Sequence, residues 1–159
     1  MTDTHVFRSR VSWGGSTGVG YDHYDRAHRA EVLDPDGRPV VPTLDGAGLR
    51  LSADPAFRGN AGLLNTEQLL VVATSSCQLL SFLAVAARAR VDVVEYIDEA
   101  VGEMPEDRLT VIRLSPVITL TGSTADERLD HLVEVAHREC YIANSLSTEV
   151  LAVPTYLHR

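Results

Sequence analysis

Two cysteines, Cys77 and Cys140, are the residues whose type and spacing best support chemistry, and 63 positions separate them (140 − 77). The N-terminus carries charged residues and no apolar signal segment, which predicts the reducing cytosol, where paired thiols are more often chemical than structural. A thiol reacts as its thiolate, which burial disfavours and a neighbouring cation favours. Because all 14 basic residues are arginine, that cation is expected to be an arginine or a charged histidine.

Composition excludes several other functions. A chain of 159 residues predicts one domain, residues 1–159, and 45% hydrophobic with 23% charged residues is typical of a globular protein. The absence of lysine excludes Schiff-base, pyridoxal-phosphate and P-loop chemistry. A net charge of −8 disfavours nucleic acid and anionic membranes as partners. His137 and Cys140 have no further ligands at metal spacing, so neither a metal nor another cofactor is expected.

A long helix is expected to position Cys77. Asn65 is a strong N-cap, Gln68 completes a capping box, and the apolar pattern continues to about Arg88 or Arg90. The apolar stretch 69–87 is long enough to span a membrane, but polar residues gather near its middle. The pattern therefore predicts a central helix buried in a soluble protein.

Strands are expected before and after this helix in the sequence. Residues 7–13 alternate apolar and polar side chains. Residues 91–101 and 109–120 predict two strands joined by a polar turn, with Pro116 at a sheet edge or a bulge. The glycine-rich residues 14–20 lack a phosphate-binding register and predict a flexible connection, and residues 150–157 predict a last strand.

A second helix is expected from Thr124, with a capping box to Glu127. Its apolar stripe runs from Leu129 to Cys140 at helical spacing, which places Cys140 on the core face. Strands, a long helix, strands and a second helix together predict an α+β fold.

Several segments of the sequence resemble those of a known protein family. The segment 65–70 (NTEQLL), Cys77 ten residues after Glu67, the segment 136–145 around the second cysteine, and the loop 54–59 (DPAFRG) are similar to the OsmC/Ohr family of thiol-dependent hydroperoxide reductases. The resemblance covers nearly the whole chain.

The resemblance implies a function, a site and partners. Cys77 would be the peroxidatic thiol and Cys140 the resolving thiol, while Arg58 and Glu67 would form an ion pair that activates Cys77. It also implies an OsmC-like fold, with antiparallel sheets packed around a long central helix carrying Cys77, and an intertwined homodimer with active sites at its interface. The substrate would be an organic hydroperoxide and the reductant an external dithiol, with a lipoylated protein as one candidate.

Two departures and one geometric constraint accompany the resemblance. The family's Asn-Pro-Glu start is Asn-Thr-Glu here, and the arginine loop varies in the family, which keeps Arg26 and Arg29 as alternatives to Arg58. Ten residues of straight helix separate Glu67 from Cys77 by about 15 Å along the axis and roughly 80° around it. Either the helix breaks or the glutamate comes from another subunit. We expect Arg58 and Glu67 of one protomer to face Cys77 and Cys140 of its partner.

The residues also allow different interpretations. Among the histidines, His28 is the first to test for a catalytic role. A cysteine-nucleophile hydrolase would use Cys77 without Cys140, and a dimeric small-molecule binding or redox-sensing module would use neither thiol in turnover.

The acidic residues 98–107 are expected to form a solvated face. Apolar neighbours on the helix predict an apolar environment for the thiol, which favours organic hydroperoxides. These neighbours are Leu79, Leu80, Phe82 and Leu83.

Overall fold

The structure, a computed structural model, describes residues 4–46 and 48–159. The elements in chain order are β1 (His5–Gly14), the 3-10 helix η1 (Thr17–Val19), β2 (Arg29–Leu33), β3 (Pro39–Val40), β4 (Leu44–Asp45), β5 (Gly48–Leu49), the 3-10 helix η2 (Pro55–Phe57), α1 (Thr66–Arg88), β6 (Val93–Met104), β7 (Val111–Leu114), β8 (Pro116–Leu120), α2 (Asp126–Arg138), α3 (Tyr141–Asn144), β9 (Glu149–Ala152) and β10 (Thr155–His158). The predicted α+β class is confirmed.

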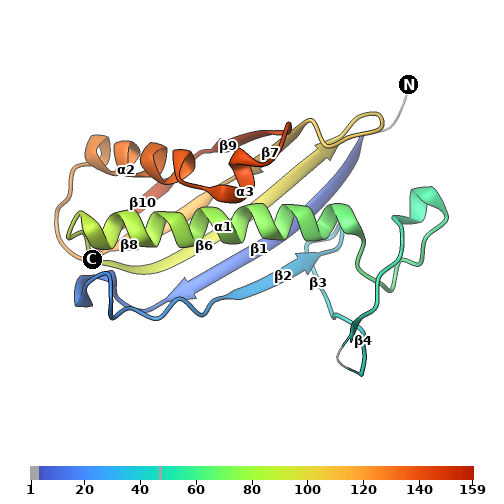
Figure 1. Ribbon diagram of the computed structural model, residues 1–159, viewed down its shortest axis with the longest axis horizontal. Coiled ribbons are helices and arrows are strands. Elements are labelled where there is room, and N and C mark those ends of the chain that lie inside the picture. Colours follow the sequence, from blue (N-terminus) through green and yellow to red (C-terminus); the bar gives the residue numbers. More distant parts are fainter. Residues whose placement is uncertain (1–3, 47) are drawn as a thin grey trace.

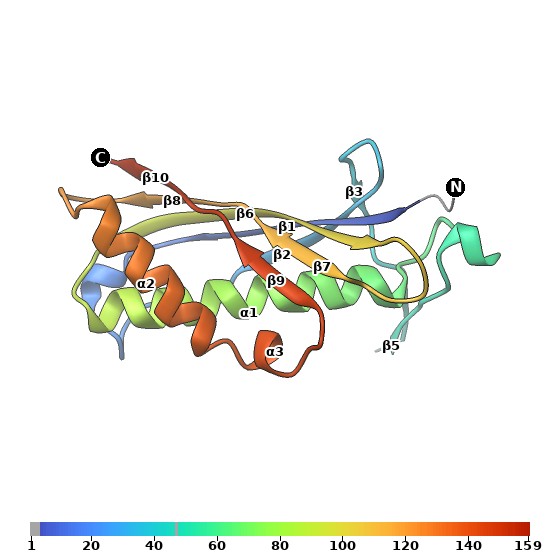
Figure 2. The same cartoon turned by 90° about the horizontal axis from the view of Figure 1, so that it is seen from above.

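An eight-stranded sheet forms one layer, in the order β10-β8-β6-β1-β2-β3, with β7 paired to β6 and β9 paired to β7. The long strand β6 organises it, because β1 pairs along one edge of β6 while β8 and β7 share the other edge. Most pairs are antiparallel, whereas β10 runs parallel to β8 and β9 runs parallel to β7. Helices α1 and α2 cover one face of the sheet (Figure 2).

Two of the expected strands are each divided by a proline. Residues 109–120 form β7 and β8 rather than one strand, and residues 150–157 lie in β9 and β10, which Pro154 separates. Pro116 was predicted at a sheet edge or a bulge, and it is at neither, because it pairs with Asp98 and the register shift between β6 and β8 lies at Val93 and Glu95. It begins β8, which lies between β6 and β10, and the first residue of a strand tolerates a missing N–H.

Helix α1 begins and ends where the sequence predicts. The Asn65 side chain accepts a hydrogen bond from the Gln68 backbone, and the Gln68 side chain accepts one from the Asn65 backbone, which completes the capping box. By length and composition alone α1 could cross a membrane, yet half of its most apolar window is buried within the fold. Figure 1 shows it lying lengthwise over the sheet, beside α2.

Helix α2 differs from the prediction at both ends. It starts at Asp126, because the backbone at Ala125 is still extended, and no side chain caps it, so the expected capping box from Thr124 is wrong. Its apolar stripe is buried as predicted, from Leu129 to Ala136. Cys140 is also buried, but it lies beyond α2, as the N-cap of the short helix α3.

The loop between β1 and β2, residues 15–28, is fixed by hydrogen bonds to the segment that enters β6, and those of Thr17 are buried. The carboxylate of Asp92 accepts hydrogen bonds from Ser16 Oγ at 2.5 Å and the Gly18 N–H at 2.8 Å. Thr17 Oγ1 donates to the Val91 carbonyl and accepts from the Val93 N–H, both at 2.7 Å. This connection therefore contains an anchored 3-10 turn, where the sequence predicted a flexible one.

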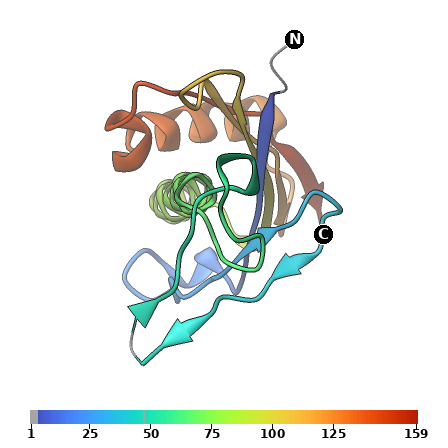
Figure 3. The same cartoon turned by 90° about the vertical axis from the view of Figure 1, so that its right-hand side faces the viewer.

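Residues 41–46 and 48–64 form an arm that projects past the N-terminal end of α1. The arm carries β4, β5 and η2 and extends away from α2 and α3 (Figures 1 and 3). Several of its large apolar side chains are exposed: Val41, Leu44, Leu49, Leu51 and Phe57. In the single chain, this apolar surface has little cover.

Candidate active site

The fold brings Cys77 and Cys140 together from distant parts of the sequence. Cys77 lies at the middle of α1 and is half-buried, whereas Cys140 is completely buried at the junction of α2 and α3. Both cysteines are free thiols, and the Cys77 thiol is close enough to act on the ionisation of Cys140 through a hydrogen bond and through its charge. The two thiols are therefore neighbours.

The electrostatics of the pair favour a protonated Cys140. Burial, with a smaller contribution from the adjacent Cys77 thiol, raises the pKa of Cys140 to about 11, against the opposing effect of the backbone N–H groups of Ala143 and Ile142. At neutral pH the buried member of the pair is therefore a neutral thiol.

A cavity of about 670 Å³ opens beside Cys77. Helix α1 contributes Leu80, Ser81, Ala84 and Arg88 to its wall beside Cys77, and the remaining lining comes from the 15–28 loop and the α2–α3 region. Three arginines lie in this lining, together with three tyrosines and one glutamate: Arg26, Arg88, Arg138, Tyr21, Tyr24, Tyr141 and Glu139. A half-buried sulfur thus faces a pocket with excess positive charge.

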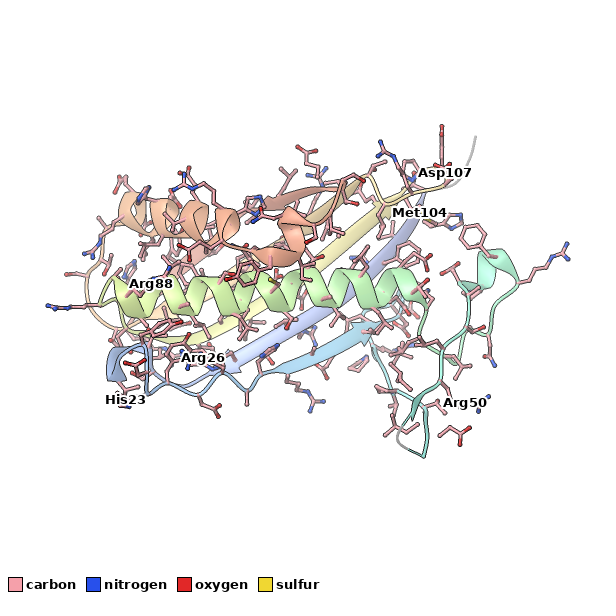
Figure 4. All side chains as sticks on the ribbon, viewed as in Figure 1. His23, Arg26, Arg50, Arg88, Met104 and Asp107 are labelled. Atoms are coloured by element: carbon pink, nitrogen blue, oxygen red, sulfur yellow. The ribbon has the colours of Figure 1, made fainter. Side chains whose placement is uncertain are left out.

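Arg26, which the sequence offered as a substitute for Arg58, is held rigidly at this cavity. Its guanidinium lies 4.1 Å from the centroid of the Tyr24 ring and 5.1 Å from that of Tyr21, and it donates to the backbone carbonyls of both residues. Arg88 forms an ion pair with Glu139 at 2.5 Å across the same cavity. Figure 4 labels Arg26 and Arg88, which lie toward the C-terminal part of α1.

The prediction that these apolar side chains surround the Cys77 thiol is mostly wrong. Leu79, Phe82 and Leu83 are almost completely buried against the sheet, and only Leu80 lines the cavity. The reason is helical periodicity, because residues 80 and 84 share a face with Cys77 whereas 79, 82 and 83 face the core. The apolar surface of the cavity is provided instead by tyrosine rings, Leu80 and Ala84.

Arg58 and Glu67 lie at the other end of α1. Arg58 is exposed at the end of η2, in the left-handed conformation with φ 65°, and Glu67 is in the first turn of α1. The Asp54 carboxylate accepts from Ala56 N–H and from the Asn65 side chain, which ties the Arg58 loop to the helix start. Within the described chain, no ion pair joins Arg58 to Glu67, and α1 is unbroken between Glu67 and Cys77.

Arg29 and His28 occupy surroundings that differ from that of Arg26. Arg29 pairs with Glu31 at 2.9 Å and has a mostly exposed side chain. His28 contacts Ser76, the residue before Cys77, through a short hydrogen bond, and its other ring nitrogen lies 2.9 Å from the Arg26 carbonyl. His28 thus connects the 15–28 loop to the centre of α1.

The sequence prediction missed Asp98. It was assigned to a solvated acidic face with Glu99, yet it is completely buried while Glu99 is exposed. Its carboxylate accepts hydrogen bonds from Ser75 Oγ at 2.5 Å and from the Ser115 N–H at 2.6 Å. Burial raises the pKa of Asp98 to about 6, against the opposing effect of these two hydrogen bonds. The alternation of side chains along a strand could have predicted this burial, because it places Asp98 on the same face as Tyr96 and Ala100.

Comparison with known proteins agrees with this architecture. The family model for OsmC-like proteins matches residues 59–152. An OsmC-like protein of unknown function from Vibrio cholerae is 27% identical, covering 98% of this chain and 100% of that one, with a TM-score of 0.62. An OsmC-like protein from Mycoplasma pneumoniae is 14% identical over 80% of this chain and 94% of that one, with a TM-score of 0.59.

A third similar structure is an OsmC-like hydroperoxide resistance protein from Jannaschia. It is 15% identical, covers 91% of this chain and 87% of that one, and has a TM-score of 0.50. No curated protein sequence matches the chain. Because the family model spans more than half of the sequence, the chain belongs to the OsmC-like protein family, and the predicted family and OsmC-like fold are confirmed.

The buried Asp98 generates a prediction about stability and pH. A carboxyl group whose pKa is higher in the folded state binds its proton more tightly there, so its stabilising contribution is complete below the unfolded pKa. The free energy of unfolding should therefore fall as pH rises from about 4 to about 6, by roughly 3 kcal/mol for a shift of about two pKa units.

Asp98→Asn is expected to remove this pH-dependent decrease in the free energy of unfolding. The variant should be more stable than the wild type at pH 7, by about 1–3 kcal/mol, since an amide can still accept from Ser115 and donate to Ser75. Urea unfolding at several pH values measures the effect, with Glu99→Gln as the control on the exposed face. A variant less stable than wild type at pH 7 would contradict it.

Proposed function

We propose that the chain is a thiol-dependent peroxidase that reduces organic hydroperoxides to alcohols, with Cys77 as the peroxidatic and Cys140 as the resolving cysteine. The observation that carries the proposal is the contact between a half-buried thiol at a cavity and a fully buried, protonated thiol beneath it. Membership of the OsmC-like family and the hydroperoxide resistance named for the Jannaschia relative support it.

The proposed reaction begins at Cys77. Its thiolate attacks the distal peroxide oxygen, the O–O bond breaks, and an arginine stabilises the departing alkoxide, which takes up a proton to become the alcohol. The resulting Cys77 sulfenic acid condenses with the Cys140 thiol to a disulfide and water. An external dithiol, for which a lipoylated protein is one candidate, then reduces the disulfide by thiol exchange. The reaction needs no further cofactor, and a cytoplasmic location would keep the thiols reduced.

Cys140→Ser separates the two steps of this reaction. The variant should still consume about one equivalent of hydroperoxide per chain and form a sulfenic acid at Cys77, because the first step does not involve Cys140. Turnover supported by a dithiol should fall to near background, since no intramolecular disulfide forms. Peroxide consumption and mass spectrometry of nonreduced peptides measure both steps.

The control for this experiment is Cys77→Ser, which should consume no peroxide. A Cys140→Ser protein with undiminished turnover would contradict the proposal and favour the cysteine hydrolase. Two thiols that react slowly with peroxide in the native wild-type protein would favour the second candidate function, a binding or redox-sensing module.

The cavity supports an organic rather than an inorganic peroxide. Tyrosine rings and the side chains of Leu80 and Ala84 provide apolar contact next to Cys77, and about 670 Å³ accommodates an organic substituent. Hydrogen peroxide cannot use these contacts. The kcat/KM for cumene hydroperoxide should therefore exceed that for hydrogen peroxide about tenfold or more. Equal values of kcat/KM for the two oxidants, measured with the same dithiol, would refute this preference.

A second copy of the chain is the proposed source of Arg58 and Glu67. The continuous α1 separates Glu67 from the Cys77 of its own chain by about 15 Å along the helix axis. The arm that carries Arg58 exposes apolar side chains, and a groove of about 460 Å³ lies between this arm, strands β2 and β3, and α1, with Val40, Val41, Leu49, Leu64, Leu69 and Val72 among the residues that line it. Such uncovered apolar surface supports an intertwined homodimer.

Mixed dimers test this arrangement. Cys77→Ser and Arg58→Ala chains should each be inactive alone, but a heterodimer purified through two different tags should regain about half of the wild-type activity. In it, one of the two symmetry-related sites combines an intact Cys77 with an intact Arg58 from the other protomer. A heterodimer without activity would overturn the shared site.

Arg26→Ala is the matched control for the mixed dimers, because Arg26 lines the cavity of the same chain as Cys77. If Arg26 rather than Arg58 activates the thiol, the Arg26→Ala homodimer should be inactive, and pairing it with Cys77→Ser should restore nothing. The two heterodimers therefore distinguish the two arginines.

A further inference from the structure

The two cysteines of the candidate site differ in what can reach them. Cys77 is half-buried and lines the cavity of about 670 Å³. Cys140 is 0% exposed, and it is not among the described residues that line this cavity. A molecule that enters the cavity therefore meets the sulfur of Cys77 and not that of Cys140.

A closed turn, residues 138–144, separates Cys140 from the cavity. Four residues of this turn line the cavity: Arg138, Glu139, Tyr141 and Asn144. Asn144 closes the turn, because its N–H donates to the Cys140 carbonyl at 3.0 Å and its side-chain amide donates to the Arg138 carbonyl at 2.9 Å. Access to Cys140 from the cavity would require this turn to open.

The cavity that leads to Cys77 carries a net positive charge. Its described lining contains three arginines and a single carboxylate, that of Glu139, which pairs with Arg88 at 2.5 Å. Arg26 and Arg138 form no ion pair with a carboxylate of residues 4–46 and 48–159. Two uncompensated guanidinium groups therefore attract an anion into the cavity, less strongly as salt screens them.

Building on the proposed function, we propose that the disulfide is reduced by an anionic thiol that enters this cavity and attacks Cys77, so that Cys140 is the sulfur released. Reduction requires direct attack of a thiolate on one of the two sulfurs, and its rate depends on which of them is accessible. Cys77 can be reached from the cavity, whereas Cys140 is enclosed by the packed interior and the 138–144 turn. Access thus selects Cys77.

The leaving sulfur has an opposing effect, which access outweighs. A leaving thiol of high pKa departs slowly, and burial raises the pKa of Cys140 to about 11. This slows attack on Cys77, whereas Cys140 is not attacked at all while the turn stays closed. Once released, the Cys140 sulfur is protonated at neutral pH, so it returns only slowly to attack the mixed disulfide. That delay gives the second thiol of the reductant time to react.

Reduction by this route passes two electrons and two protons from a dithiol to the cysteine pair. The first thiol of the reductant loses its proton to solvent and its sulfur bonds to Cys77. The Cys77–Cys140 bond breaks with its electron pair on Cys140, which takes up a proton. The second thiol loses its proton and attacks the reductant sulfur of the mixed disulfide. The electron pair of that bond returns to Cys77, which takes up the second proton, and the reductant leaves as its own disulfide.

A monothiol stops the reaction at the mixed disulfide and shows which sulfur is attacked. The protein is oxidised with one equivalent of cumene hydroperoxide, mixed with 2-mercaptoethanesulfonate and quenched with acid after increasing times. In mass spectra of nonreduced peptides, the adduct on Cys77 should exceed that on Cys140 about tenfold or more. An adduct that is equally or more abundant on Cys140 at the earliest times overturns the proposal, as does a disulfide that this thiol leaves intact.

The way in which the disulfide is made separates this proposal from the proposed function. If cumene hydroperoxide produces no Cys77–Cys140 disulfide, the peroxidase function fails. The same disulfide formed with diamide still reports which sulfur the thiol attacks. The route of reduction is therefore tested whether or not the chain is a peroxidase.

Three small thiols test the charge of the cavity. The rate of disulfide reduction, divided by the concentration of thiolate, should decrease from 2-mercaptoethanesulfonate through 2-mercaptoethanol to cysteamine. The anionic thiol should react about tenfold or more faster than the cationic one at low salt, and added salt should reduce this ratio because it screens the arginines. Equal rates for the three thiols, or a faster reaction with cysteamine, overturn the anionic reductant.

Arg138→Gln locates the charge in the cavity. The variant should slow 2-mercaptoethanesulfonate about threefold or more and leave 2-mercaptoethanol within about twofold of wild type, while the backbone carbonyl that accepts from Asn144 remains. A purely structural effect would change the rates of all three thiols together. The matched control is Arg113→Gln, which removes an exposed arginine of β7 that pairs with Glu103 outside the cavity and should leave the ratio unchanged. An Arg138→Gln protein with the wild-type ratio of rates overturns the role of the cavity charge.

Discussion

The contact between the middle of α1 and the α2–α3 junction is the interaction on which the candidate site depends. It places the Cys77 thiol against the buried Cys140 thiol, which neither helix could do alone. The contact exists because α1 and α2 pack side by side on one face of the sheet. Burial of Leu129, Val133 and Ala136 of α2 fixes the end of that helix, and the chain turns there into α3.

Positive charge at the cavity is a local property of an otherwise acidic chain. The net charge is −8, yet Arg26, Arg88 and Arg138 all line the cavity beside Cys77. Stacking on two tyrosine rings and bonds to backbone carbonyls hold Arg26 in place, and no carboxylate among residues 4–46 and 48–159 forms an ion pair with it. An arginine held in this way keeps its charge available to an anion in the cavity, such as a thiolate or an alkoxide.

Two buried polar side chains of β6, Asp98 and Tyr96, oppose the stability of the fold. A carboxyl group with a raised pKa is destabilising at neutral pH relative to its protonated form, and the unpaired hydroxyl of Tyr96 adds to that cost. Sites that combine such groups are often functional, because activity and stability place different demands on the same residues.

The sequence by itself determined the long helix from its capping box at Asn65 to Arg88, the first strand, the buried stripe of α2 and the family. These are local patterns, or similarities along the chain. Only the tertiary structure decided that residues 109–120 divide at Pro116, where the Ser115 N–H turns to Asp98. Likewise, only packing buried Asp98 and brought Arg26 rather than Arg58 to the Cys77 of the same chain. The physical reason is that burial, proximity and the pKa of a group depend on which elements pack together, and residues far apart in sequence supply those elements.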